Sequence, residues 1–370
     1  MKFMNKRFLN SVRSIFRVIF LLHFLVFPLH LSKAGAFDNL SVSLAGDLVF
    51  QQAFSKESKI DGHDSKFKVR SAEMAFYAPI DHQFDAFLSF AAHEESGVVN
   101  AELHELYFSS SKLIPRTRFK VGQFFLGIGR LNRFHQHDWY FTTAPKIFEE
   151  LYGDEGVFDA GLEFSYLLPM NHFLELTMGV TSGYNFGHTH SNGKKPKLPT
   201  HYARLATSFS DSTSFADEIG VNYLRRKDSL SHDRQSIGLD LTFKWKKKKF
   251  LRYLIQSEAW FNETVIPGQH NSKVAGVYLY NQYAFNPSWS VGLMLDAFKD
   301  LNLRDVTGVI DNNIYYNFSP NITYASSEFF KSRLSYGYSF SRIEGKTRDE
   351  SSLAELQFTL ILGDHPSHDF

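Results

Sequence analysis

The sequence predicts an all-β protein, a transmembrane antiparallel β-barrel of about 16 strands, and three observations predict it. Short segments alternate apolar and polar residues, as strands do where lipid covers one face and water the other. The last segment, residues 352–363, places Leu356 and Phe358 on one face and Gln357 on the other. Short connections alternate with longer, more polar ones, and the chain begins with an export signal. Together these patterns are typical of a bacterial outer-membrane barrel.

Residues 1–36 have the three parts of a cleaved signal peptide. Basic residues from Lys2 to Arg17 precede an apolar core at residues 18–31, and Ala34-Gly35-Ala36 supplies small residues for cleavage. The apolar core is shorter than the roughly 20 residues of a spanning helix. An uncleaved anchor helix is the alternative. We expect cleavage after Ala36, which leaves residues 37–370 as a single outer-membrane β-barrel domain.

The composition excludes several classes of protein. The 40 Lys and Arg include six in the signal, so the mature chain holds 34 of them against 39 Asp and Glu, a net charge near −5. This balance gives no sign of nucleic-acid binding. The chain has no Cys, which excludes a lipid-anchored cysteine, disulfides and thiolate metal sites. Aromatic residues make up 16%, which suits the girdles at the two membrane interfaces.

Sixteen segments have the length and alternation of tilted spanning strands. They lie at about 40–50, 67–78, 84–93, 100–108, 117–126, 157–167, 173–183, 201–209, 215–225, 235–245, 250–261, 273–285, 288–298, 312–324, 329–340 and 352–363. An even number brings both termini to the periplasmic side. Pro320 lies inside one segment and removes a ladder donor, so fourteen strands is the fallback. A soluble β-sandwich or jelly roll is the other alternative, but neither needs the export signal.

The alternation also assigns charged residues to the lumen. A midplane Arg or Lys on the lipid face would cost about 2–4 kcal/mol. Charged residues of the spanning strands are therefore expected to point into the lumen. The predicted lumen-lining residues are Arg118, Lys120, Glu163, Glu175, Arg204, Asp240 and Lys244. A barrel of sixteen strands has room for a water-filled interior of this mixed charge.

The longest connection, residues 127–156, is the third outer loop. It carries apolar and aromatic residues among charged ones, and loops of this length usually have a function. We expect it to fold inward and narrow the pore. A lid packed over the barrel mouth is the alternative. The predicted constriction residues are Arg130, Arg133, His135, His137, Asp138, Asp154 and Glu155.

Several short motifs resemble one porin family. They are Lys120-Val121-Gly122-Gln123-Phe124, Gly129-Arg130-Leu131-Asn132, His137-Asp138-Trp139, Gly153-Asp154-Glu155-Gly156 and Leu167-Leu168-Pro169. This set resembles the phosphate-selective porin O/P-like family, most densely over residues 100–169 and at the C-terminus. The resemblance implies a sixteen-stranded, trimeric diffusion channel with its third loop inside.

No metal site or cofactor is expected. His188 and His190, like His135 and His137, are spaced as possible ligand pairs, but such pairs in loops are more often solvated. His190-Ser191-Asn192-Gly193 is close to the His-x-Ser-Asn pattern of outer-membrane lipid hydrolases. Here the histidine is adjacent to Ser191 and points the opposite way in a strand, so its imidazole cannot take the hydroxyl proton. The protein is therefore not expected to be an enzyme.

The sequence thus predicts a passive porin of the bacterial outer membrane for small hydrophilic solutes or ions, with anions such as phosphate among them. The expected partners are outer-membrane lipid and lipopolysaccharide, two further copies in a homotrimer, and the barrel-assembly machinery, which would read the last strand and Phe370. The alternatives are a non-conducting, surface-binding or adhesive barrel and, less favoured, a lipid hydrolase.

Overall fold

The computed structural model describes residues 39–60, 62–95, 98–186, 189–190, 194–210, 212–247, 250–302, 313–342 and 349–363. The chain divides into two compact units, Met1–Asn39 and Leu40–Phe370, and all elements below belong to the second. The predicted signal peptide and Phe370 lie outside the described residues. No helix in the described part of the chain is long and apolar enough to cross a membrane.

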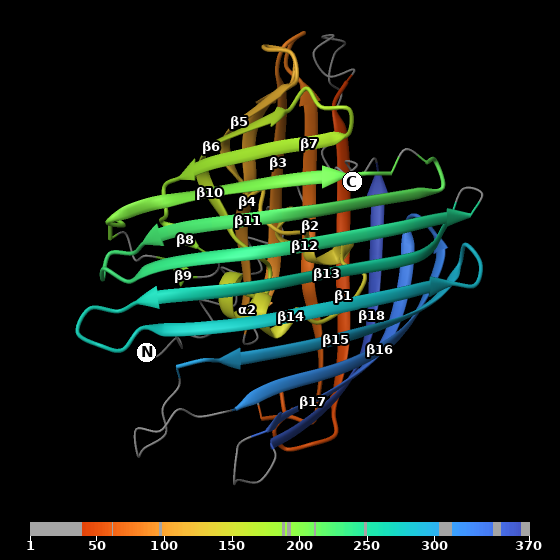
Figure 1. Cartoon of the computed structure of the whole chain (residues 1–370). Coiled ribbons are helices and arrows are strands. Elements are labelled where there is room, and N and C mark those ends of the chain that lie inside the picture. Colours follow the sequence, from red (N-terminus) through yellow and green to blue (C-terminus); the bar gives the residue numbers. More distant parts are fainter. Residues whose placement is uncertain are drawn as a thin grey trace, which may run out of the picture. The chain divides into compact units, whose positions relative to one another are not determined.

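Sixteen strands of the described chain close into an antiparallel barrel, because β1 pairs with both β2 and β18 (Figure 1). The wall strands are β1 (Ser41–Ala53), β2 (Ser65–Pro79), β3 (Asp85–Glu95), β4 (Val98–Ser110), β5 (Thr117–Phe125), β6 (Phe158–Leu167), β7 (Phe173–Thr181), β10 (Leu198–Ser208), β11 (Phe215–Lys227), β12 (Asp233–Lys247), β13 (Phe250–Val265), β14 (Ser272–Ala284), β15 (Trp289–Asp300), β16 (Ile314–Ser327), β17 (Phe330–Arg342) and β18 (Asp349–Gly363). The predicted sixteen-stranded barrel is confirmed.

Pro320 lies inside β16 without breaking the barrel. It stays paired with Leu293 of β15, whereas the ladder toward β17 is interrupted between Phe318 and Asn321. The missing proline N–H therefore falls on one side of the strand only. Because β16 stays in the wall, the barrel keeps sixteen strands, and the fourteen-strand alternative is wrong.

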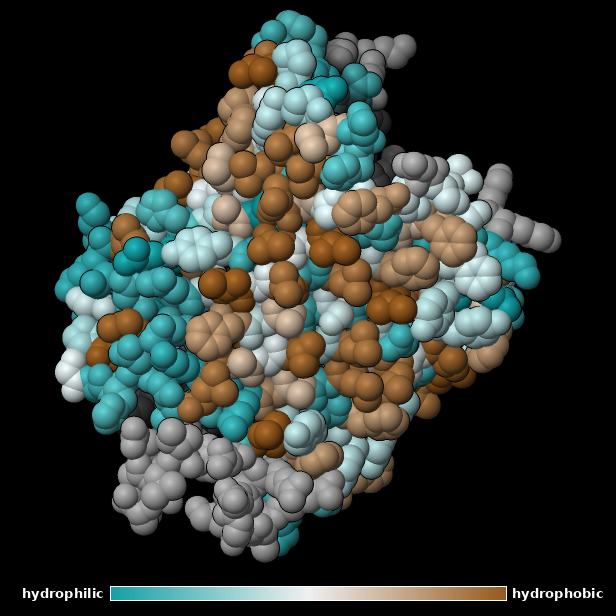
Figure 2. Space-filling view, in the orientation of Figure 1, coloured by the Kyte–Doolittle hydropathy of each residue, from teal (hydrophilic) through white to brown (hydrophobic). Residues whose placement is uncertain are grey.

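The strand faces follow the predicted alternation. In β12, the outward side chains of Ile237 and Leu239 are 55% and 54% exposed, whereas Asp240 beside them is 2% exposed. Figure 2 shows hydrophobic side chains gathered across the middle of the wall, with hydrophilic residues at one end of the strands. An apolar band bounded by polar ends is the outer surface that a lipid bilayer requires.

The third loop folds into the barrel, as predicted. It contains two short 3₁₀ turns, η1 (Leu131–Arg133) and η2 (Gln136–Asp138), and the helix α2 (Lys146–Tyr152), which is seen behind β13 and β14 in Figure 1. The next outer connection forms a separate small hairpin, β8 (Asn185–Phe186) and β9 (Thr189–His190).

Apolar side chains of the third loop form a core inside the lumen. Phe148 and Tyr152 of α2 are almost fully buried, and they pack with Trp139 of the loop and Trp260 of β13. Burying large aromatic side chains contributes roughly 1.5–3 kcal/mol each. The lid alternative is wrong, because this core lies between the loop and the inner wall.

Candidate functional site in the barrel lumen

Hydrogen bonds fix the third loop to several strands of the wall. The backbone N–H of Leu131 donates to Glu258 Oε1 on β13 (2.8 Å), and that of Lys146 donates to Asp296 Oδ2 on β15 (2.7 Å). Arg333 Nη2 of β17 donates to the backbone oxygen of Trp139 (3.1 Å). Because these partners are buried carboxylates and a buried guanidinium, the loop position is strongly specified.

Gly129 allows the loop to approach the wall closely. Its φ is +59°, and a Cβ at this position would lie 2.4 Å from Glu258 Oε2. Its backbone N–H donates to Asn222 Oδ1 of β11 (2.7 Å). Any other residue would therefore be strained both by its backbone conformation and by this contact.

A cavity of about 250 Å³ lies between the third loop and the wall. Five of the seven predicted lumen residues line this lumen cavity, together with two of the predicted constriction residues: Arg118, Lys120, Glu163, Glu175 and Arg204 from the wall, and Arg133 and His135 from the loop. The strand alternation and the inward fold of the loop together therefore brought these side chains to one place.

Three of the four Lys and Arg residues that line the lumen cavity are paired with carboxylates. Arg204 Nη2 contacts Glu218 Oε1 (2.7 Å) and Asp240 Oδ1 (2.6 Å), and Arg133 Nη2 contacts the same Glu218 oxygen (2.5 Å). Lys120 Nζ lies 3.3 Å from Glu163 Oε1. The two acidic partners of Arg204, Glu218 and Asp240, are 5% and 2% exposed and are not among the residues that line the cavity. The cavity surface itself is of mixed charge, because Glu105, Glu163 and Glu175 line it together with the basic residues.

His135 is held between two glutamates of the wall. Its Nδ1 is 3.0 Å from Glu73 Oε2 and its Nε2 is 3.1 Å from Glu105 Oε2. Burial opposes the charged form, but these carboxylates outweigh it and hold the pKa of His135 well above its ordinary value. Both ring nitrogens therefore donate, and His135 adds a positive charge to the lumen cavity.

The other predicted site residues lie away from the lumen cavity. Arg130 is 3% exposed, with its guanidinium carbon 4.1 Å from the centre of the Phe134 ring, and burial lowers its pKa to about 10. Asp154 is exposed at the surface, and Lys244 is partly buried on the face of β12 that carries Asp240.

Two further predicted residues are neighbours in the loop. His137 Nε2 lies 3.5 Å from Asp138 Oδ2, and the backbone oxygen of His137 accepts a hydrogen bond from Lys331 of β17. Neither residue lines the cavity, and the backbone of His137 helps to hold the loop against β17.

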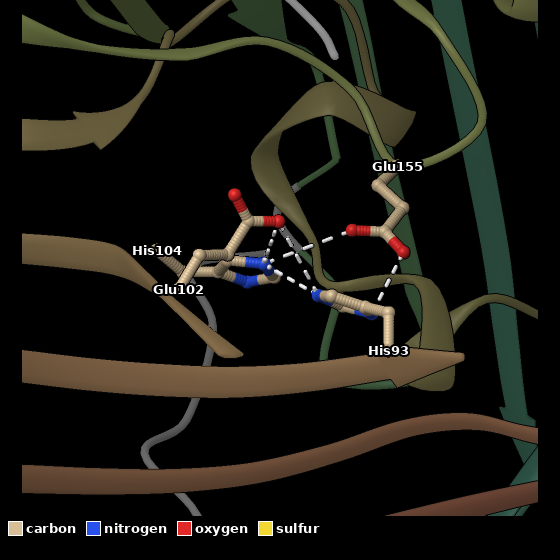
Figure 3. Close-up of side chains that lie close together, drawn as sticks. All are labelled: His93, Glu102, His104 and Glu155. Atoms are coloured by element: carbon tan, nitrogen blue, oxygen red, sulfur yellow. Dashed lines mark hydrogen bonds and ion pairs between the residues drawn. The ribbon is translucent and has the colours of Figure 1, made fainter. Parts of the chain in front are cut away.

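Glu155, the last predicted constriction residue, belongs to a cluster that sequence reasoning missed. This histidine–carboxylate cluster consists of His93 on β3, Glu102 and His104 on β4, and Glu155 at the end of the third loop (Figure 3). His93 Nε2 and His104 Nε2 are 2.9 Å apart, and Glu155 Oε1 lies 2.9 Å from His93 Nδ1.

A β-bulge explains why the alternation did not reveal this cluster. Ser89 pairs with Glu105 and Phe90 pairs with Leu103, so His104 is an extra residue in β4. As a result His104 and Glu105, although adjacent, are both buried, whereas strict alternation puts one of them in lipid. Bulges re-aim side chains in this way. The sequence did carry one signal of the bulge: two adjacent polar residues, His104 and Glu105, within a spanning strand.

The hydrolase pattern is only partly placed. His190 ends the small strand β9, and Ser191, Asn192 and Gly193 lie outside the described residues.

Comparison with known proteins gives the family. Residues 81–362 match the model of the family described as "Putative beta-barrel porin-2, OmpL-like". An "Uncharacterized protein" of Aquifex aeolicus (strain VF5) is 26% identical over 341 residues, covering 82% of this chain and 70% of its own.

Two solved structures share the fold. OmpT of Vibrio cholerae in a trimer form superposes with a TM-score of 0.58 at 10% identity, covering 88% of this chain and all of that one. The anion-selective porin from Comamonas acidovorans superposes with a TM-score of 0.59 at 8% identity. The match covers 87% of this chain and all of that one.

The closed barrel, its apolar outer band and its inward third loop define a porin-like channel of the bacterial outer membrane. Since the family match spans more than half of the chain, the protein belongs to the β-barrel porin-2, OmpL-like family. A porin family is thereby confirmed. The resemblance to the phosphate-selective porin O/P-like family stays a prediction.

Proposed function

We propose that this porin is a passive diffusion channel for small hydrophilic solutes and ions, with its narrowest point set by the third loop. The observation that carries the proposal is the lumen cavity, where charged side chains of the wall face charged side chains of the loop. Rings of charged side chains at a constriction set ionic selectivity in channels.

We further propose a weak preference for anions, phosphate among them. Four basic side chains and the charged His135 line the lumen cavity, against Glu105, Glu163 and Glu175. The preference is weak because Arg133, Arg204 and Lys120 each have a carboxylate within 3.3 Å, which offsets most of their field. Within the predicted constriction, Arg133 and His135 therefore take the leading part.

The proposed assembly is a homotrimer embedded in outer-membrane lipid and lipopolysaccharide. The apolar outer face of the wall supports the lipid contact. The resemblance to trimeric porins and the trimer form of Vibrio cholerae OmpT support the number of copies. Insertion by the barrel-assembly machinery through the last strand is part of the same proposal.

Single-channel recording of the refolded protein in a planar bilayer tests the proposal. A gradient of KCl reads ion preference from the reversal potential, and phosphate is then titrated into both chambers. We expect stable conductance steps, a reversal potential that indicates a small excess of chloride current, and a reduced current at millimolar phosphate. A folded barrel that conducts nothing would contradict the channel, and a cation-selective current would contradict the anion preference alone.

A further inference from the structure

The histidine–carboxylate cluster gathers four metal-ligating side chains from two strands and the third loop. Glu102 Oε1 lies 3.7 Å from both His93 Nε2 and His104 Nε2, and Glu155 Oε2 lies 3.7 Å from His104 Nε2. One donor atom from each residue lies within 4.8 Å of the others. Figure 3 shows the two imidazole rings side by side, with a carboxylate on either side of them.

We propose that His93, Glu102, His104 and Glu155 bind one divalent transition-metal ion, and that Zn²⁺ is the ion they fit best. The site goes beyond the channel function and does not depend on it.

The distances suit zinc with little rearrangement. A point equidistant from His93 Nε2, His104 Nε2 and Glu102 Oε1 lies about 2.0 Å from each of them, and Zn–N and Zn–O bonds are ~2.0–2.2 Å long. Tetrahedral zinc holds two nitrogens about 3.3 Å apart, so the two rings need to separate by only a few tenths of an ångström from the observed 2.9 Å. Glu155 Oε2 is the fourth candidate donor.

Glu155 also fixes the tautomer that a ligand needs. Its Oε1 lies 2.9 Å from His93 Nδ1, with the backbone oxygen of Arg70 at 3.3 Å from the same nitrogen. When His93 Nδ1–H donates to these oxygens, its Nε2 carries the lone pair that faces His104. Metal-binding histidines almost always have such a carboxylate or carbonyl partner on the second nitrogen.

A neighbouring group is less suited to hold an ion. Glu73, His104 and His135 also lie within ligand distance of one another, but both nitrogens of His135 already face carboxylates, at 3.0 and 3.1 Å. His135 therefore has no lone pair to offer while these contacts persist. Since His104 is common to the two groups, we place a single ion, in the cluster with four donors.

The surroundings favour a filled site and allow an ion to reach it. Two carboxylates and two neutral imidazoles balance the charge of one M²⁺ ion, which matters because His93 and His104 are only 5% and 3% exposed. The Glu102 side chain is 27% exposed, so the cluster opens on that side. Because Glu155 belongs to the loop and the other three to the wall, the ion would tie the end of the third loop to β3 and β4.

Isothermal titration of the refolded full barrel with ZnCl₂, and separately with MgCl₂, tests this site. We expect one Zn²⁺ per chain and no comparable binding of Mg²⁺, because imidazole ligands suit zinc rather than magnesium. His93→Ala with His104→Ala should weaken zinc binding by at least about 100-fold. Glu155→Gln should weaken it by at least about 10-fold, because it removes the charge of the fourth donor and the carboxylate partner of His93 Nδ1.

His201→Ala is the matched control, since this histidine is exposed on β10 and hydrogen-bonds only locally to Pro199. Glu102→Gln keeps the size of a partly exposed side chain and replaces the double variant if that one does not fold. Zinc affinity that is unchanged in Glu102→Gln and in the folded histidine variants would overturn the site. Mg²⁺ binding as tight as that of Zn²⁺ would overturn it as well.

Discussion

Replacing Phe148 by alanine should release the third loop from the lumen. Phe148 is 1% exposed, and its ring centre lies 5.3 Å from that of Trp139 and 5.5 Å from that of Tyr152. Truncating a buried Phe to Ala costs about 3–5 kcal/mol. Phe148 packs against Tyr152, which in turn contacts Trp260 of β13, so its loss weakens the core between loop and wall. If the whole cost falls on loop docking, the docked-to-undocked ratio drops by roughly 10²–10⁴.

Limited trypsin digestion of the folded barrel measures the release, since the loop carries cleavage sites at Arg133 and Lys146. We expect faster cleavage at these sites and larger, noisier conductance steps in the variant. Phe318→Ala is the control, because Phe318 is 46% exposed on the outer face of β16 and does not touch the loop core. If Phe148→Ala is cleaved no faster than wild type and Phe318→Ala, the aromatic core does not hold the loop.

Three further predictions concern the cavity, the wall and the metal. Arg133→Ala should lower the anion-to-cation permeability ratio by up to about sixfold, because a unit charge across ~8 Å of water changes the energies of anion and cation by about 0.5 kcal/mol each, in opposite directions. Arg130→Ala, buried away from the cavity, should change the ratio less, and equal shifts in reversal potential would refute this. Leu239→Lys should lower the free energy of unfolding by about 2–4 kcal/mol, because Leu239 is 54% exposed on the lipid face. Urea unfolding from lipid vesicles measures this, and an unchanged midpoint would mean that this face does not meet lipid. Zn²⁺ at 100 times its Kd should stabilise the barrel by about 2.7 kcal/mol, seen as a rise in Tm that EDTA reverses; a Tm insensitive to both would mean that zinc does not bind the folded state.

Most of the barrel could be predicted from sequence because lipid imposes a rule that applies residue by residue. A charged side chain such as Asp240 must face inward, and its neighbours Leu239 and Leu241 must face outward. Alternation alone therefore predicts where the strands lie and which of their side chains face the lumen. The inward loop followed from similar reasoning, since the apolar and aromatic residues of this thirty-residue segment have to be covered.

The predictions failed where the local rule does not hold. The bulge at His104 shifts the alternation by one residue, and no pattern within β4 says that Ser89 pairs with Glu105 rather than with its neighbour. The contacts of His135 with Glu73 and Glu105 join residues 62 and 30 positions apart. Such pairs depend on how the loop crosses the lumen, which a single sequence does not specify.

The most direct measurement compares the single-channel conductance of the wild-type protein with that of a variant in which a short Gly-Ser linker replaces residues 134–152. This deletion removes α2 and the buried aromatic side chains of the loop, Trp139, Phe141, Phe148 and Tyr152, while leaving all sixteen described wall strands in place. We expect both proteins to conduct, with larger steps and weaker ion preference in the variant. Two folded barrels with the same conductance and selectivity would contradict the claim that the third loop sets the narrowest point of the channel.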